Sequence, residues 1–277
     1  VVLCESPSYL GALNAFNAYQ PKFVEVPTDN GGLIPEELDK ILETTPNCKF
    51  IYVIPDFQNP TGRTWSMERR KAFMEVVNKH NLPVIEDNPY GELRYEGEIL
   101  PSLKSLDTKG LVMFLGTFSK IFCPGLRLGW VAAEHSLLTQ FVKIKQSADL
   151  HTSNFDQGVA DAYMEQYDLD EHVKEIVALY KHRRDLILES MEKYFPAGTE
   201  WTHPEGGLFL WLTFPEGVSA RKVFNKCIEM KVAGVIGDAF YPNQKTDRSM
   251  RINYSNMPDD RIVEGIQRMA KAIKECM

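Results

Sequence analysis

Residues 116–130, "GTFSKIFCPGLRLGW", place two hydroxyls, an amine and a guanidinium in a stretch that is otherwise mostly apolar. Thr117, Ser119, Lys120 and Arg127 supply these groups, between the apolar runs "LVMFLG" and "RLGWVAA". A buried strand that ends in such a cluster suggests a ligand site at the strand terminus. The simpler alternative is a surface lysine beside a turn.

Three other predicted strands also carry polar side chains at or near an end. "FIYVI" leads into "PDFQNPTG" with Asn59, "LPVI" leads into "EDNPYGE" with Asp87 and Tyr90, and "MRINYS" has Arg251 near its start. Each residue alone has an ordinary explanation as a turn, cap, core or surface residue. Their association favours one site, because ligands of parallel sheets bind outside the carboxyl ends of the strands.

The residue types in this set match the chemistry of pyridoxal phosphate. A lysine such as Lys120 can form a Schiff base with the cofactor's aldehyde if its pKa is lowered. A buried carboxylate such as Asp87 can keep the pyridine nitrogen protonated, so that the ring withdraws electrons. Asn59 and Tyr90 can donate hydrogen bonds to the ring's phenolic oxygen.

The phosphate group of that cofactor needs hydroxyl and cationic donors. Thr117 and Ser119 offer the hydroxyls, and Arg127 offers a planar guanidinium that can bond two phosphate oxygens. The sequence therefore contains a candidate for every polar contact that the cofactor requires.

The order of predicted elements indicates an α/β fold. Buried strands are predicted at 49–54, 82–87 and 111–116, and a helix at 66–80 with Ser66 as its N-cap. Strand, helix and strand in close succession favour βαβ units and a mostly parallel sheet. Another strand is predicted at 127–133.

From about Ser136 the chain is predicted to be mainly helical, with helices at 136–150 and 168–195. A smaller α+β unit should follow, so we predict a cofactor-binding domain over 1–180 and a small C-terminal domain over 181–277. The elements predicted in the second unit are strands at 208–214, 232–236 and 250–255 and helices at 220–230 and 259–276.

The strings "PSY", "NPTG", "EDNPYGELRY", "TFSKIFCPGLRLGW", "EGGLFLW" and "MRINYS", in this order, resemble those of fold-type I, class I/II pyridoxal-phosphate aminotransferases. The resemblance covers nearly the whole chain. Within the family, the strings are similar to those of the 2-aminoadipate and kynurenine aminotransferase subgroup. It implies that Lys120 carries the cofactor and acts as the catalytic proton shuttle. It further implies roles in cofactor binding for Tyr9, Asn59, Asp87, Tyr90, Thr117, Ser119 and Arg127, and in substrate binding for Arg251 and Asn59.

The same resemblance implies a three-layer αβα large domain with a mostly parallel sheet, and a homodimer that moves an amino group between an amino acid and a 2-oxo acid such as 2-oxoglutarate. In this family a glycine-rich phosphate-binding loop and an N-terminal arm precede the point that corresponds to Val1. Because "VVLCE" is predicted to be a buried strand, we expect a leading segment before it.

Two other functions remain open from the sequence. One is a different pyridoxal-phosphate enzyme of the same fold, such as a β-lyase, which would release ammonia and pyruvate. The other is a non-catalytic ligand-sensing domain of a transcription regulator, which would be joined to a winged-helix module.

Composition narrows the possible partners and location. The net charge of −7 argues against nucleic acid as the main partner, and no apolar run is long enough to span a bilayer. Five scattered cysteines and six scattered histidines provide no metal-ligand spacing and no disulfide pattern. We therefore expect a cytoplasmic protein with reduced thiols, small-molecule substrates and no metal.

Overall fold

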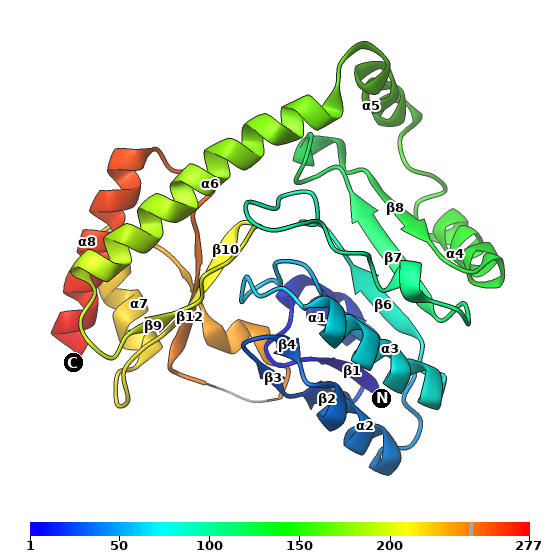
Figure 1. The fold of residues 1–277 in the computed structure, drawn as a ribbon, viewed down its shortest axis with the longest axis horizontal. Helices are drawn as coiled ribbons and strands as arrows, with labels where there is room; N and C mark the ends of the chain where they lie inside the picture. Colours follow the sequence, from blue (N-terminus) through cyan, green and yellow to red (C-terminus); the bar gives the residue numbers. More distant parts are fainter. Residues whose placement is uncertain (244–245) are drawn as a thin grey trace.

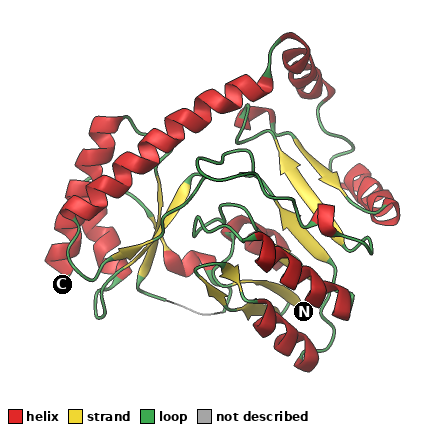
Figure 2. Ribbon diagram, in the orientation of Figure 1, coloured by secondary structure: helices red, strands yellow, loops and turns green. Residues whose placement is uncertain are grey.

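Two β-sheets and the helices that cover them form the fold, which is described here from a computed structural model for residues 1–243 and 246–277 (Figures 1 and 2). A short hairpin of β3 (Thr28–Asp29) and β4 (Gly32–Leu33) accompanies the larger sheet. Within these ranges, none of the helices combines the length and the apolar character needed to cross a membrane.

The larger sheet has six strands in the order β2-β1-β5-β6-β7-β8. All neighbouring strands are parallel except β7 and β8, which pair antiparallel. The prediction of a mostly parallel sheet is therefore confirmed. The strands are β1 (Val2–Glu5), β2 (Phe23–Val26), β5 (Phe50–Val53), β6 (Val84–Asp87), β7 (Val112–Thr117) and β8 (Gly129–Ala132).

Helices lie on both faces of this sheet, which gives the three layers predicted. Successive residues of β1 point to opposite faces. Leu3 packs in a cluster with residues of α2 (Pro35–Thr44) and α3 (Met67–His80). Val2 and Cys4 pack in another cluster with Leu13 of α1 (Leu10–Asn17).

Helix α3 shows how local sequence sets an element's bounds. The Ser66 side chain accepts a hydrogen bond from the backbone N–H of Arg69 (3.2 Å). This confirms the prediction that Ser66 is the N-cap of the helix. Asn81 ends the helix in the left-handed conformation with φ of 50°. The chain is thereby turned directly into β6.

Three helices connect the two sheets. They are α4 (His135–Ala148), α5 (Asn154–Gln166) and α6 (Leu169–Tyr194). Asp168 caps α6 by accepting the backbone N–H groups of Asp170 and Glu171. Figure 1 shows α6 running from α5 to the C-terminal part of the molecule. Short 3₁₀ turns also occur at η1 (Lys104–Leu106), η2 (Pro124–Leu126) and η3 (Gly237–Phe240).

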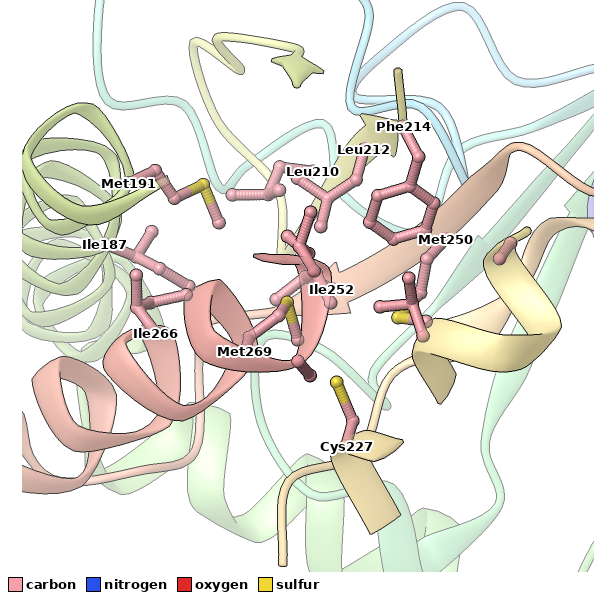
Figure 3. Close-up of a cluster of buried hydrophobic side chains, with 14 of the residues drawn as sticks. Ile187, Met191, Leu210, Leu212, Phe214, Cys227, Met250, Ile252, Ile266 and Met269 are labelled. Atoms are coloured by element: carbon pink, nitrogen blue, oxygen red, sulfur yellow. The ribbon is translucent and has the colours of Figure 1, made fainter. Parts of the chain in front are cut away.

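The second sheet is antiparallel, with the strand order β11-β12-β10-β9. Its core is a cluster formed with α6 and the two last helices; Figure 3 shows Ile187 and Met191 of α6 beside side chains of the sheet and of α8. The elements are β9 (Glu200–Trp201), β10 (Phe209–Thr213), α7 (Ala220–Glu229), β11 (Val235–Ile236), β12 (Ser249–Asn253) and α8 (Asp259–Cys276).

The strand predicted at 232–236 is shorter in the structure, because its first residues complete the end of α7. Lys231 takes the left-handed conformation with φ of 60°, and the Val232 N–H donates to the Cys227 carbonyl (2.8 Å). Only Val235 and Ile236 remain to pair with β12.

Helix α6 contacts both halves of the molecule. Its first part, with Ile176, Val177 and Tyr180, packs on a cluster that includes Tyr90. Its later part, with Ile187 and Met191, packs in the core of the second sheet. The domain boundary at 180/181 falls between these two parts and stays a prediction.

A buried ion pair fixes the loops that follow β5 and β6. Arg70 of α3 is fully buried, and its guanidinium lies 2.5 Å from the Asp56 carboxylate. It also donates to the backbone carbonyls of Trp65 (3.2 Å) and Pro101 (3.0 Å). One side chain thus joins the loop after β5 to the loop after β6.

We predict that Arg70→Met lowers the free energy of unfolding by about 3–5 kcal/mol, because it leaves the Asp56 carboxylate buried without its main partner. The neighbouring Arg69 forms a more exposed pair with Asp29, so Arg69→Met should cost less than about 1 kcal/mol. Denaturant unfolding of the two variants measures both values. Equal losses would contradict the importance of the buried pair.

Candidate active site

One cavity of about 440 Å³ contains all nine of the residues proposed from the sequence. Four apolar or ring-bearing residues that were not proposed also line it: Leu10, Ile54, Pro89 and Phe209. The proposed residues in its lining are Tyr9, Asn59, Asp87, Tyr90, Thr117, Ser119, Lys120, Arg127 and Arg251.

The topology of the larger sheet explains this convergence. Tyr9 follows β1, Asn59 follows β5, Asp87 ends β6 and Thr117 ends β7. Because these strands are parallel, their carboxyl ends meet at one edge of the sheet. Arg251 reaches the same cavity from β12 of the second sheet, so the cavity lies between the two halves of the chain.

Lys120 lies in the turn after β7 and is partly buried. Burial, and then the positive charges of Arg127 and Arg251, hold the pKa of its amine below the usual range. Within residues 1–243 and 246–277, no carboxylate pairs with this amine. The lowered pKa makes the neutral amine of Lys120 more accessible than that of an exposed lysine, and the neutral amine is the form that a nucleophile or base requires.

Asp87 is held by a tyrosine from the adjacent strand. The Tyr52 hydroxyl donates to its Oδ2 (2.5 Å). Burial raises the pKa of the Asp87 carboxyl, and the Tyr52 hydrogen bond lowers it in part. A cationic group beside this carboxylate would favour its ionised form. No sequence signal marks Tyr52, which lies in an apolar strand run and also packs edge-on against Phe16.

The turn between β7 and β8 places two hydroxyls and a guanidinium together. The Thr117 hydroxyl donates to the Leu128 carbonyl (2.9 Å), accepts the Ser119 N–H (3.1 Å) and lies 3.0 Å from the Ser119 hydroxyl. Arg127 has a left-handed backbone with φ of 55°, and its Nη1 donates to the Pro124 carbonyl (3.0 Å). Most of the guanidinium donors of Arg127 remain available to an anion.

Asn59 links the two sheets across the cavity. Its Nδ2 donates to the Tyr90 hydroxyl (3.3 Å), and its Oδ1 accepts from Nη1 of Arg251 (2.8 Å). Burial raises the pKa of Tyr90, so its hydroxyl keeps its proton and can donate. The amide of Asn59 thus orients one hydroxyl and one guanidinium.

The cavity has an excess of positive charge. Lys120, Arg127 and Arg251 line it, whereas Asp87 is the only carboxylate among the described residues of its lining. None of the three cations forms an ion pair with a carboxylate in the described ranges. Such a cavity fits ligands with at least two anionic groups.

This donor set fits pyridoxal 5′-phosphate together with a carboxylate substrate. The hydroxyls of the β7–β8 turn and Arg127 suit a phosphate, and the buried carboxylate of Asp87 suits a protonated ring nitrogen. The remaining cation, Arg251, suits a substrate carboxylate.

The glycines of "EGGLFLW" allow a close packing that the sequence left open. A Cβ on Gly206 would lie 2.4 Å from the Leu93 carbonyl oxygen, and one on Gly207 would lie 2.5 Å from Cβ of Phe57. Gly207 also has φ of 74°. The turn before β10 therefore packs directly on the loops that carry Asn59 and Tyr90.

Comparisons with known proteins agree on one family. The family model "Aminotransferase class I and II" matches residues 1–269. The chain is 43% identical to "Aromatic-amino-acid aminotransferase 1" of Thermococcus litoralis, over all of this chain and 67% of that protein. It is 34% identical to the "2-aminoadipate transaminase" of Thermus thermophilus, over 99% of this chain and 69% of that protein.

A solved structure gives the same result for the fold. The kynurenine aminotransferase of Pyrococcus horikoshii, solved with PMP, superposes with a TM-score of 0.96 and 42% identity, over 99% of this chain and 69% of that one. The chain thus spans about two thirds of the length of the proteins that it matches.

We predict that Lys120 loses its proton at a lower pH than exposed lysines do, since burial and two arginines disfavour its charged form. Lys40 is a suitable reference, because its hydrogen bond to Glu37 raises its pKa. Arg127→Met should move the Lys120 titration to higher pH but leave it below about 10.4, since burial remains.

An NMR titration of ¹³C-dimethylated lysines measures both groups in the same sample. A Lys120 signal that titrates together with Lys40, or that does not respond to Arg127→Met, would contradict the electrostatic description of the cavity.

Proposed function

The chain belongs to the aminotransferase class I and II family, and we propose that Lys120, Asp87 and Arg251 are the residues that carry out its amino-group transfer. The protein is an aminotransferase that uses pyridoxal 5′-phosphate to move an amino group between an amino acid and a 2-oxo acid. The resemblance found in its sequence is confirmed. The observation that carries the residue assignment is their convergence in one cavity.

The cofactor supplies an aldehyde that can accept an amine and a ring that withdraws electrons from the substrate Cα. Lys120 would hold that aldehyde, because its amine is the one whose pKa is lowered in the cavity. Its Nζ would accept the proton from the substrate Cα and return it, as a general base and then a general acid.

Asp87 would hold the ring nitrogen in its protonated form. The hydrogen bond from Tyr52 fixes its Oδ2 and leaves Oδ1 available. Asn59 and Tyr90 would donate to the ring's phenolic oxygen, and Tyr9 would cover a face of the ring. Thr117, Ser119 and Arg127 would hold the phosphate.

Arg251 would bind the α-carboxylate of the substrate, with Asn59 holding one edge of its guanidinium. A guanidinium can bond both oxygens of a carboxylate, which fixes the direction of the Cα–H bond relative to Lys120. The same contact serves the amino acid and the 2-oxo acid, since both carry this carboxylate.

We infer that 2-oxoglutarate is the acceptor, as the resemblance in the sequence implies. The names of the relatives favour a donor with a long or aromatic side chain. Leu10 and Ile54 provide apolar lining for such a side chain. A panel of tyrosine, phenylalanine, kynurenine and 2-aminoadipate with 2-oxoglutarate tests this choice. Release of ammonia and pyruvate from a substrate with a β leaving group, without glutamate formation, would favour a β-lyase.

We predict that Lys120→Ala lowers kcat by at least about 10²- to 10⁴-fold, because the general acid–base group is removed. Lys271→Ala, on the exposed side of α8, should keep the wild-type rate. Coupled measurement of glutamate formation gives both rates. Undiminished turnover in Lys120→Ala would exclude the assignment.

We also propose that the protein is a cytoplasmic homodimer. The five cysteines are free, which suits a reducing compartment. Exposed apolar side chains gather along β8, α4 and α5, and contiguous apolar surface often marks a protein interface. These side chains are Trp130, Val131, Phe141, Val142, Ile144, Phe155 and Val159.

We predict a solution mass of twice 31.6 kDa for the wild type, and a shift toward 31.6 kDa for a variant carrying Ile144→Asp and Phe155→Asp. Charged groups on this surface would have to be desolvated on association, which is costly. Ile99→Asp alters an exposed residue outside these three elements and should leave the mass unchanged. Light scattering after size-exclusion chromatography measures the solution mass of the wild type and of both variants.

A further inference from the structure

Arg251 has an unusual environment for a partly buried guanidinium. Its Nη1 donates to Asn59, yet no carboxylate in the described ranges pairs with it. Two aromatic rings lie beside it instead. The Arg251 Cζ is 4.1 Å from the centre of the Phe209 ring and 5.1 Å from the centre of the Phe240 ring.

The two rings can stabilise this charge without occupying its hydrogen-bond donors. A guanidinium loses hydration when it is buried, and a neighbouring carboxylate would normally compensate. Such a carboxylate would also compete with the carboxylate of an incoming substrate. The face of an aromatic ring attracts a cation but accepts no conventional hydrogen bond in the guanidinium plane. The N–H groups that do not contact Asn59 therefore stay available.

Both rings are held by their own contacts. Phe209 on β10 packs edge-on against Tyr90, with ring centres 6.0 Å apart. Phe240 at the end of η3 is fully buried and packs edge-on against Trp211, with ring centres 5.6 Å apart. The Phe240 carbonyl accepts the Ser8 N–H (2.8 Å) in the segment after β1. The position of each ring is therefore set by the fold, independently of any ligand.

We propose that Phe209 and Phe240 are positioning residues that hold the Arg251 guanidinium charged, unpaired and correctly oriented for a ligand carboxylate. This rests on the proposed function, which assigns the substrate carboxylate to Arg251. The two rings act through Arg251, so they set the affinity for every carboxylate ligand and leave the proton transfer at Lys120 unchanged.

The kinetic test uses Phe209, because its side chain is only partly buried and its replacement should be tolerated. Phe209→Leu should raise KM about tenfold for both the amino acid and the 2-oxo acid, with kcat within about twofold of wild type. Phe209→Tyr keeps the ring face, so both KM values should stay within about twofold of the wild-type values. Phe240→Leu should act in the same direction as Phe209→Leu.

Phe73→Leu provides a matched control for lost aromatic packing. Phe73 is fully buried and packs against Trp65 in the core of the larger sheet, away from Arg251. Phe73→Leu should lower the melting temperature and leave both KM values unchanged. If Phe73→Leu raises KM as much as Phe240→Leu does, the effect is one of general stability and the proposal is overturned.

A binding measurement tests the proposal without turnover. Calorimetry on the cofactor-loaded protein compares 3-phenylpropionate with 3-phenylpropanol, which has the same ring and lacks the carboxylate. In Phe209→Leu the Kd of the acid should rise about tenfold, and the affinity for the alcohol should stay the same. Equal weakening of both ligands would mean that Phe209 contacts the phenyl group only, and would overturn the proposal.

Arg251→Met separates this inference from the proposed function. If Arg251→Met weakens binding of the acid and Phe209→Leu and Phe240→Leu do not, Arg251 binds the carboxylate without help from the rings, and only the inference fails. If Arg251→Met leaves binding of the acid unchanged, or the wild type does not bind the acid, the proposed role of Arg251 fails and the inference fails with it.

Discussion

Three positive charges that form no ion pair within the described part of the chain are the constraint on which this site depends. Lys120, Arg127 and Arg251 converge on a cavity with a single carboxylate, Asp87, in its lining. Burial first, and then the charges of Arg127 and Arg251, disfavour the charged form of the Lys120 amine. The same charges attract a phosphate and a carboxylate. Arg127 and Arg251 therefore contribute both to the lowered pKa of Lys120 and to the binding of anionic ligands.

Buried polar contacts in the loops keep these groups in place. Gln58 donates from Nε2 to the Pro7 carbonyl (2.8 Å) and accepts the Thr61 N–H at Oε1 (2.9 Å), so it joins the segment of Tyr9 to the turn of Asn59. Glu5 accepts the Ile54 N–H (3.0 Å), and burial raises its pKa to about 8. Together with the Arg70–Asp56 pair, these contacts join the loops that follow β1, β5 and β6, whereas most guanidinium donors of Arg127 and Arg251 stay available to a ligand.

Sequence reasoning was successful where a pattern is local. Apolar runs and the Ser66 cap predicted β5, β6, β7 and α3, and strand ends predicted where polar groups would meet. It did not identify contacts made across the fold. Tyr52 and Phe240 look like ordinary core aromatics, since their partners Asp87 and Arg251 are 35 and 11 residues away in the chain and meet them only through the topology. The early end of the strand at 232–236 was likewise set by the left-handed Lys231, a conformation that a lysine's identity does not predict.

The proposed chemistry depends on the amine of Lys120 being the group that holds the cofactor. The most direct measurement is to add pyridoxal phosphate to the purified protein, reduce with borohydride, and locate the pyridoxyl group by peptide mass spectrometry. We expect one major modified residue, Lys120, and loss of that product in Lys120→Ala. A pyridoxyl group fixed mainly on another lysine, with Lys120 unmodified, would contradict it.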